Sequence, residues 1–446
     1  MGSRPVKHLL FTMSVPMMAS MMVQALYNIV DSVFVARLGE NALAAVTLAF
    51  PVQAVMIGAG AGVGVGANAL LSKSLGERRY KQANQTALHA VFLVLPGAAF
   101  FALAGGLFGT RYFAVQTDST EIIALGKDYL IPLCLCSFAL LSQITFERLL
   151  SSTGKTLYAM ISQMTGAALN MALDPIMIFG LFGFPALGVK GAAIATVAGQ
   201  CAACVAGLAC NLRKNREIRL SPREFGLDLS IIKTIYRVGV SSILMQTTGS
   251  LMIYGINRIL LSFGPAAIAV FGVFFRLQSF LLMPVFGLNN AMVPIIAFNY
   301  GAGNRGRIAE TVRLGMLWAG AVMFAGFLLF QVLPDRMLLL FSAGAEMRAI
   351  GVPALRIISI GFLFVGFCIV GITVFQALDN GAAGAVVAVS RQLALLLLLY
   401  LLSLRRIIDA LWWAFPLAEA LCLGICAALL KRVYTRKIRA VPDEVS

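Results

Sequence analysis

The chain has 446 residues, of which 60% are hydrophobic and 12% are charged, and its mean hydropathy is +0.88. Soluble domains average about 45–50% apolar and about 25% charged residues, so this composition excludes a soluble globular protein and indicates a polytopic membrane protein. The net charge of +16 comes from bases in short loops beside apolar segments, a pattern that sets membrane orientation and argues against nucleic-acid binding.

Apolar runs separated by short polar loops predict an all-α protein with twelve membrane helices. Each run is long enough to cross the hydrocarbon core as a helix. We place the helices at residues 9–36, 44–71, 86–108, 122–147, 156–180, 190–211, 231–262, 267–297, 311–333, 349–377, 382–404 and 408–430. The longest polar loop divides the chain, and we expect a first lobe at 1–211, a cytoplasmic linker at 212–230 and a second lobe at 231–446.

Lysines and arginines are concentrated in one set of loops. They gather at the amino terminus, at 73–81, at 213–223, at 305–313 and in the carboxyl-terminal tail, whereas the opposite loops carry fewer. Positively charged loops remain on the cytoplasmic side during insertion. Both termini and the linker are therefore predicted to be cytoplasmic.

The two halves of the chain resemble each other. With a shift of 225 positions, Gly62 aligns with Gly287 and Gly76 aligns with Gly301. Gly76 and Gly301 each follow an apolar helix and precede a basic turn. Six helices in each copy give both copies the same orientation, so an axis along the membrane normal should relate them. This architecture suits alternating access, in which two bundles rock about a central site.

The first predicted helix contains two residues that are unusual inside a membrane span. Pro16 removes a backbone donor and should kink the helix. Asp31 places a carboxylate in an apolar run, at a cost of about 2.5–3.5 kcal/mol unless it has a partner. A second acid, Asp174, lies in the fifth helix. In the second half, Asp31 falls on Ile256 and Asp174 falls near Leu401, so we expect both acids to serve a site in the first lobe alone.

Further oxygen atoms accompany these acids. Asn170 lies one helical turn before Asp174, Pro175 disturbs the backbone beside the acid, and Thr196 adds a hydroxyl from the sixth helix. Such hard oxygen ligands suit a small cation, and two acids in a low dielectric also suit a shared proton. The predicted coupling ion is Na⁺ or H⁺, with Na⁺ held by Asp31, Asn170 and Asp174. A hydrogen-bonded structural cluster is the alternative interpretation.

The second half carries charges of its own inside predicted spans. Arg276 lies in the eighth helix, Arg391 in the eleventh and Glu419 in the twelfth, and we expect all three to be buried. Arg391 and Glu419 lie near the middle of their spans, so they are predicted to pair. The pair can hold structure without binding a ligand; alternatively, Glu419 contributes to a substrate site.

Enzyme chemistry finds no support in the sequence. The chain has no nucleophile elbow, no zinc-protease motif and no phosphate-binding loop. We therefore expect a protein that is not an enzyme and that needs no cofactor besides its coupling ion.

Four stretches carry a family resemblance: YNIVDSVFVARLGENALAAVTLAFP (27–51), LNMALDPIMIFG (169–180), GAAIAT (191–196) and PVFGLNNAMVPIIAFNYGAGN (284–304). Together they resemble the MATE family of multidrug and toxic compound extrusion transporters, over nearly the whole chain. The likeness is greatest to the bacterial branch that includes the DinF-, MepA- and VmrA-like pumps.

This resemblance implies two six-helix lobes around a central cleft. It implies an antiporter of the plasma (inner) membrane that admits Na⁺ or H⁺ as an organic, often cationic, compound leaves. It assigns Asp31, Asn170, Asp174 and Thr196 to the cation site of the first lobe, and Pro16 to the kink in the first helix.

The chain departs from the NorM-like branch of the family, whose second lobe uses acids in helices 7 and 10. Here helix 7 has no acid, and helix 10 offers only Asp379 near its cytoplasmic end. An ion site of that kind is therefore not expected in the second lobe.

The expected partners are small organic substrates and the lipid bilayer, and we expect a monomer. The alternative function is a flippase for a lipid-linked saccharide, as in relatives of the same superfamily. Such a protein would need several unpaired bases for a pyrophosphate. The deep bases of this chain are Arg276, Arg391 and Arg356.

Overall fold

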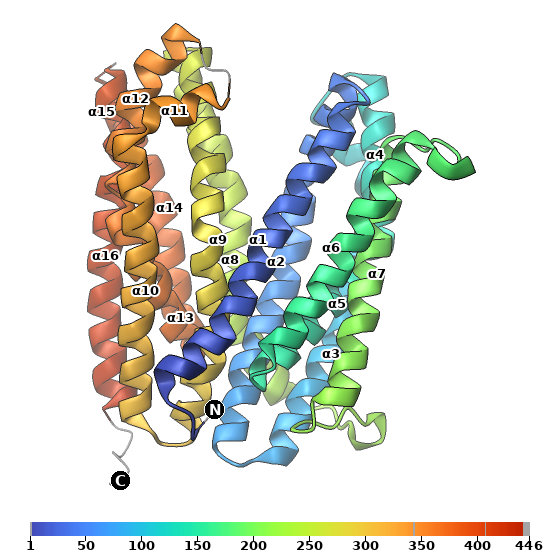
Figure 1. Ribbon diagram of the computed structural model, residues 1–446, viewed down its shortest axis with the longest axis vertical. Coiled ribbons are helices and arrows are strands. Elements are labelled where there is room, and N and C mark those ends of the chain that lie inside the picture. Colours follow the sequence, from blue (N-terminus) through green and yellow to red (C-terminus); the bar gives the residue numbers. More distant parts are fainter. Residues whose placement is uncertain (1, 342–343, 406, 440–446) are drawn as a thin grey trace.

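The computed structural model describes residues 2–341, 344–405 and 407–439, and the regular elements in these residues are helices (Figure 1). The first half forms α1 (Val6–Ala36), α2 (Glu40–Gly76), α3 (Tyr80–Ala114), α4 (Thr120–Leu135), α5 (Ser137–Ser152), α6 (Thr156–Phe179) and α7 (Val189–Lys214). The second half forms α8 (Leu229–Leu260), α9 (Pro265–Gly301), α10 (Arg305–Val332), α11 (Pro334–Leu339), α12 (Ala345–Ser359), α13 (Phe362–Ala377), α14 (Gly381–Ser403), α15 (Ile408–Trp412) and α16 (Ala414–Val433).

Most of these helices qualify as membrane spans by length and apolar composition. In the described residues these are α1, α2, α3, α7, α9, α10, α14 and the run from α15 through α16. The bent pairs α4–α5 and α12–α13 add two more. The helices α6 and α8, with 24 and 32 residues, do not meet both criteria but run alongside the others (Figure 1). Counting them gives the expected twelve, and the all-helical multi-pass prediction is confirmed.

Two spans were expected to be continuous and are instead broken. The pair α4–α5 is bent by 50° at Cys136, and the pair α12–α13 is bent by 46° before Phe362. Pro132 precedes the first break by one turn, and the second break follows Ser359 and contains Gly361. Proline and Gly/Ser combinations are common causes of helix kinks.

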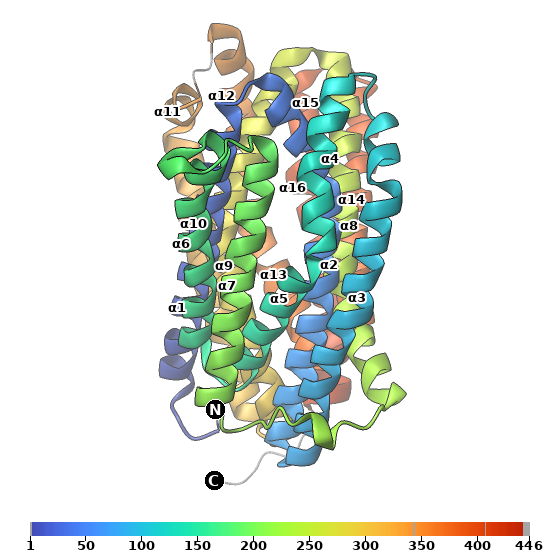
Figure 2. The same cartoon turned by 90° about the vertical axis from the view of Figure 1, so that its right-hand side faces the viewer.

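The helices form two groups, α1–α7 and α8–α16, whose ribbons diverge toward the end of the molecule opposite the chain termini (Figure 1). The first and last described parts of the chain lie at the other end, together with the linker between α7 and α8 (Figures 1 and 2). These two parts and the linker therefore lie on one side of the molecule, as the distribution of bases requires.

Glycines at equivalent positions of the internal repeat lie where the two halves contact each other. A Cβ atom on Gly62 of α2 would lie 2.4 Å from the side chain of Ile243 in α8, and one on Gly287 of α9 would lie 2.5 Å from the backbone of Met18 in α1. Ile243 and Met18 are also 225 positions apart. The contacts α2–α8 and α9–α1 therefore repeat one packing arrangement, which confirms the predicted register of the internal repeat.

A second reciprocal contact lies near the end that holds the termini. A Cβ atom on Gly76 would lie 2.0 Å from the carbonyl oxygen of Phe298, and one on Gly301 would lie 2.2 Å from the carbonyl oxygen of Lys73. Phe298 and Lys73 again differ by 225 positions. The helices α2 and α9 thus cross in backbone contact, and a pseudo-two-fold axis relates the halves.

The helix α1 belongs to both groups. Near its start, Leu9, Leu10 and Met13 are buried in the hydrophobic core of the second half. Near its end, Val35 is buried in the core of the first half. The helix remains continuous through Pro16, which lies just before its close contact with α9. A shift of α1 therefore changes packing in both halves.

Candidate functional site

The two acids predicted to form the site lie on neighbouring helices. Asp174 of α6 is fully buried, and Asp31 of α1 is half-buried. The helices α1 and α6, which carry these two acids, pack against each other. The structure therefore brings the acids of the first and fifth spans into one region of the first half.

Asn170 connects Asp174 to the next helix. Its Nδ2 atom donates to Asp174 Oδ1 at 3.2 Å and to Thr196 Oγ1 of α7 at 3.4 Å. The helices α6 and α7 can approach this closely because Gly166 and Gly199 face each other: a Cβ on either would lie 2.7 Å from the other's carbonyl oxygen. The predicted grouping of Asn170, Asp174 and Thr196 is thus a hydrogen-bonded unit.

Three acceptor oxygens of this group have no hydrogen-bond partner among the residues that the structure describes. They are Asp31 Oδ1, Asp174 Oδ2 and Asn170 Oδ1, and all three atoms are buried. Buried acceptors without partners are rare and each needs an explanation. A monovalent cation or a proton satisfies such oxygens, and two carboxylates with an amide oxygen form a suitable donor set for either. We call Asp31, Asn170, Asp174 and Thr196 the α1–α6 cluster.

Comparison with known families identifies the family of the chain. The sequence model of the MatE family matches residues 16–176 and 238–401, one segment in each half of the chain. The chain belongs to the MATE family.

Two relatives and a solved structure match over nearly their whole length. The multidrug export protein MepA of Staphylococcus aureus is 24% identical over 447 residues, covering 98% of this chain and 96% of its own, and MepA of Staphylococcus haemolyticus is 23% identical over 441 residues, covering 97% and 94%. A solved structure described as the outward-facing conformation of a multidrug resistance MATE family transporter matches with a TM-score of 0.91 at 23% identity, covering 98% of this chain and 97% of that one. At this identity, the structural likeness establishes the fold.

A further acidic residue in the first half of this MATE chain, Glu147, was not predicted to lie inside the bundle. Glu147 of α5 is half-buried, and its Oε1 accepts from Gln143 Nε2 at 3.1 Å. Tyr27 of α1 lies within electrostatic reach of Glu147, Asp31 and Asp174. Glu147 stands at the end of the predicted span 122–147, but α5 continues to Ser152 and places it inside the bundle. The glutamine one turn earlier was the signal that could have revealed it.

The predicted span 122–147 leaves Arg148 in the loop that follows it, and that placement is wrong. The residue lies within α5, and its Nη1 atom donates to Asn290 Oδ1 of α9 at 2.7 Å. Its side chain passes Gly64 of α2, where a Cβ would lie 2.7 Å from Arg148 Cγ. An arginine of the first half therefore reaches across α2 to an asparagine of the second.

The charged residues predicted in the second half differ in burial and in their partners. Arg391 Nε donates to Glu419 Oε1 at 2.7 Å, as expected. The other Glu419 oxygen is buried and has no hydrogen-bond partner in the described part of the chain. Arg276 was predicted to be buried, but its side chain is exposed, so that prediction is wrong. Asp379 pairs with Arg237 of α8 at 2.5 Å.

Proposed function

We propose that this MATE chain is a multidrug efflux antiporter that exports organic, often cationic, compounds in exchange for H⁺ or Na⁺. The observation that carries the proposal is the α1–α6 cluster with its three unpartnered oxygens. The names of the MepA relatives support the multidrug part. The cluster supports the coupling part of the proposal. Buried acceptor oxygens without a hydrogen-bond partner cost free energy, and a bound cation removes that cost.

The helix α1 supplies the proposed coupling. Its first turns pack in the second half and its last turns pack in the first, with Asp31 in the latter section. A cation bound between Asp31 and Asp174 favours the arrangement in which α1 lies against α6. An exported compound that favours a different arrangement of α1 then lowers the affinity for the cation, and the cation lowers the affinity for the compound equally.

Alternating access follows from the pseudo-two-fold design. We propose that residues 1–211 and 231–446 move as two lobes, joined by the linker at 212–230. The glycine crossings of α2 with α8 and of α9 with α1 supply the close contacts about which they rock. The proposed protein is a monomer in the plasma membrane with both termini in the cytoplasm, since the bases gather at that end.

Efflux from proteoliposomes under imposed gradients tests this function. A fluorescent organic cation is loaded, and either a pH gradient or a Na⁺ gradient is applied. We expect one gradient to drive efflux by the native chain and neither to drive it with Asp174→Asn, which keeps the side-chain volume and removes the charge. Asp118→Asn is the matched control, because Asp118 is exposed between α3 and α4. Equal efflux by Asp174→Asn and the native chain would contradict the proposal.

The flippase alternative gains no support from the arrangement of its bases. Arg391 is engaged by Glu419 rather than unpaired. Arg276 and Arg356 are exposed and lie on different helices, α9 and α12. A pyrophosphate would need several such bases to converge.

A further inference from the structure

An open, shallow pocket of about 620 Å³ lies on the surface at the end of the molecule that holds the linker, between the first turns of α3 and α8. Three bases line it, together with two amides and one acid. These residues are Arg78, Arg79, Lys81, Gln82, Gln85 and Asp228. We call them the basic pocket. The pocket is distinct from the α1–α6 cluster and takes no part in the proposed transport chemistry.

The pocket has an excess of positive charge. Arg79 pairs with Glu77 at 3.3 Å, and Asp228 is engaged by the first turn of α8, where its Oδ1 accepts from the backbone N–H of Ser230 at 2.8 Å. The side chain of Ser230, together with its backbone N–H, holds the pKa of Asp228 below its usual range, so the acid stays ionised. Within the described residues, Arg78 and Lys81 form no ion pair. Two cations thus remain to meet an anion from outside the chain.

The internal repeat shows that these bases are not needed to build the turn. Arg78 corresponds to Gly303 in the second half, and both adopt a left-handed backbone, with φ of 58° and 75°. Arg79 corresponds to Asn304, whose Oδ1 caps α10 by accepting from the backbone N–H of Arg307 at 3.1 Å, whereas Arg79 gives α3 no side-chain cap. Glycine and asparagine are the residues that such a turn favours. The first half therefore keeps arginines at two places where they weaken the fold.

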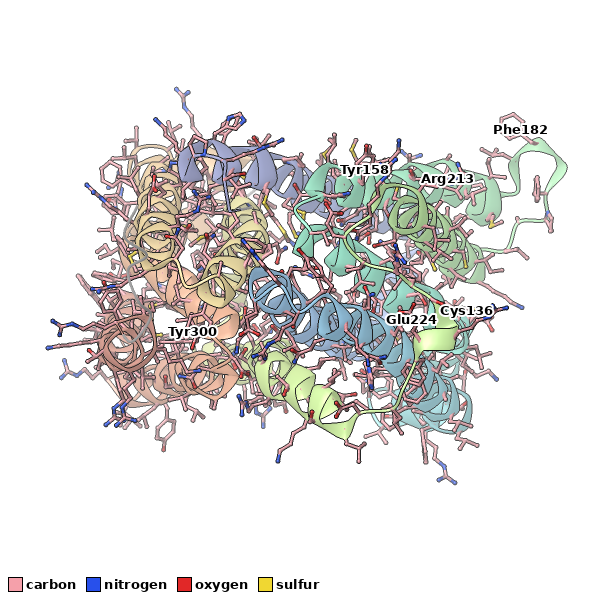
Figure 3. The ribbon with its side chains drawn as sticks, turned by 90° about the horizontal axis from the view of Figure 1, so that it is seen from below. Cys136, Tyr158, Phe182, Arg213, Glu224 and Tyr300 are labelled. Carbon is pink, nitrogen blue, oxygen red and sulfur yellow. The ribbon has the colours of Figure 1, made fainter. Side chains whose placement is uncertain are left out.

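The surroundings of the basic pocket suit an amphiphile. Along α3 and α8, toward the middle of the molecule, apolar side chains are uncovered by protein; Leu95 is 56% exposed and Tyr236 is 43% exposed. Seen from the end that holds the termini, α8 lies at the edge of the molecule (Figure 3). Acyl chains can therefore lie against these helices while a charged group occupies the pocket.

We propose that the basic pocket binds the phosphate headgroup of an anionic phospholipid from the leaflet on the side of the termini. Arginine forms bidentate hydrogen bonds with phosphate oxygens, and pockets of bases near the membrane surface bind anionic headgroups. The walls of the pocket come from α3 of the first half and α8 of the second. Its two sides are held together where the backbone N–H of Asp228 donates to His89 Nε2 at 2.8 Å. A bound lipid bridges the two halves and stabilises the arrangement seen here.

The test compares the full chain in nanodiscs of phosphatidylcholine with nanodiscs that also contain phosphatidylglycerol. We expect phosphatidylglycerol to raise the thermal unfolding temperature of the native chain. The double variant Arg78→Gln/Lys81→Gln should lose most of that rise. The control is Arg213→Gln/Lys214→Gln, which removes two exposed bases from the end of α7, across the linker from α8 (Figure 3). This control should keep the full rise.

A second variant separates loss of the site from loss of folding. Arg78→Gly/Arg79→Asn installs the residues of the second half, so it should unfold at a higher temperature than the native chain in phosphatidylcholine while losing the response to phosphatidylglycerol. An equal response in the native chain and both pocket variants would overturn the proposal. So would full protection by soluble glycerol phosphate in phosphatidylcholine nanodiscs, because the site would then serve a soluble anion.

Discussion

The hydrogen bond between Arg148 and Asn290 should bias the balance between conformations, because it joins α5 of the first half to α9 of the second. A hydrogen bond with a charged donor contributes about 1.5–3 kcal/mol. If the bond exists only in the arrangement seen here, its loss shifts the ratio of conformations by roughly 10- to 150-fold, since 1.4 kcal/mol corresponds to a factor of ten. Asn290→Ala removes the acceptor. Arg148→Met removes the donor and keeps most of the side-chain length beside Gly64.

Electron paramagnetic resonance distances can measure this shift. Labels at Val115 and Leu340, which are 88% and 80% exposed at the diverging ends of the two halves, report the separation of those ends. Labels carried on unnatural amino acids avoid the eight cysteines of the chain. Both single variants should increase the population with the shorter separation. The double variant Arg148→Met/Asn290→Ala should add little to either one.

Additive effects in the double variant would show that the two residues act independently. An unchanged distance distribution in Asn290→Ala would refute the reasoning altogether, because that substitution leaves the charge of Arg148 and its interaction with Glu147 in place.

Three further predictions concern other contacts. Glu147→Gln should lower gradient-driven efflux without lowering the unfolding temperature, and unchanged transport would remove Glu147 from the site. Gly301→Val should destabilise the protein by about 1–3 kcal/mol through overpacking, because a Cβ there would lie 2.2 Å from a carbonyl oxygen of α2; Gly306→Ala, whose Cβ would meet nothing closer than 3.9 Å, is the control in the same denaturation series. Arg391→Met should destabilise by about 3–5 kcal/mol by leaving Glu419 unpaired, and adding Glu419→Leu should restore most of the loss; thermal unfolding that fails to recover in the double variant would contradict this explanation.

The membrane environment explains why so much of the fold could be predicted. A spanning helix must satisfy its backbone internally and present apolar side chains, so the sequence marks each span by composition alone. The glycines at 62, 76, 287 and 301 then revealed the repeat, because close helix crossings exclude any larger residue. The bends at Cys136 and before Phe362 could not be predicted in the same way. A proline precedes the bend at Cys136, but Pro175 lies inside a continuous α6, so a proline alone does not show where a helix breaks.

The cost of a charged side chain in a membrane also explains which residues of the site could be predicted. An isolated acid is costly in a membrane, so Asp31 and Asp174 could be expected to meet. Glu147 was missed because it falls at the end of a predicted span, where charges are common. Arg276 was wrongly placed in the interior because a residue's position along a helix does not tell which face of the helix is covered.

We propose that this chain exchanges a cation for an exported compound through the α1–α6 cluster. Reciprocal linkage makes this measurable without a membrane gradient. The purified chain is mixed with a lipophilic organic cation in weak buffer, and released H⁺ or Na⁺ is recorded with ion-selective electrodes. The account predicts release of one of these ions by the native chain and none by Asp174→Asn. Binding of the organic cation with no ion released, or with equal release from both proteins, would contradict it.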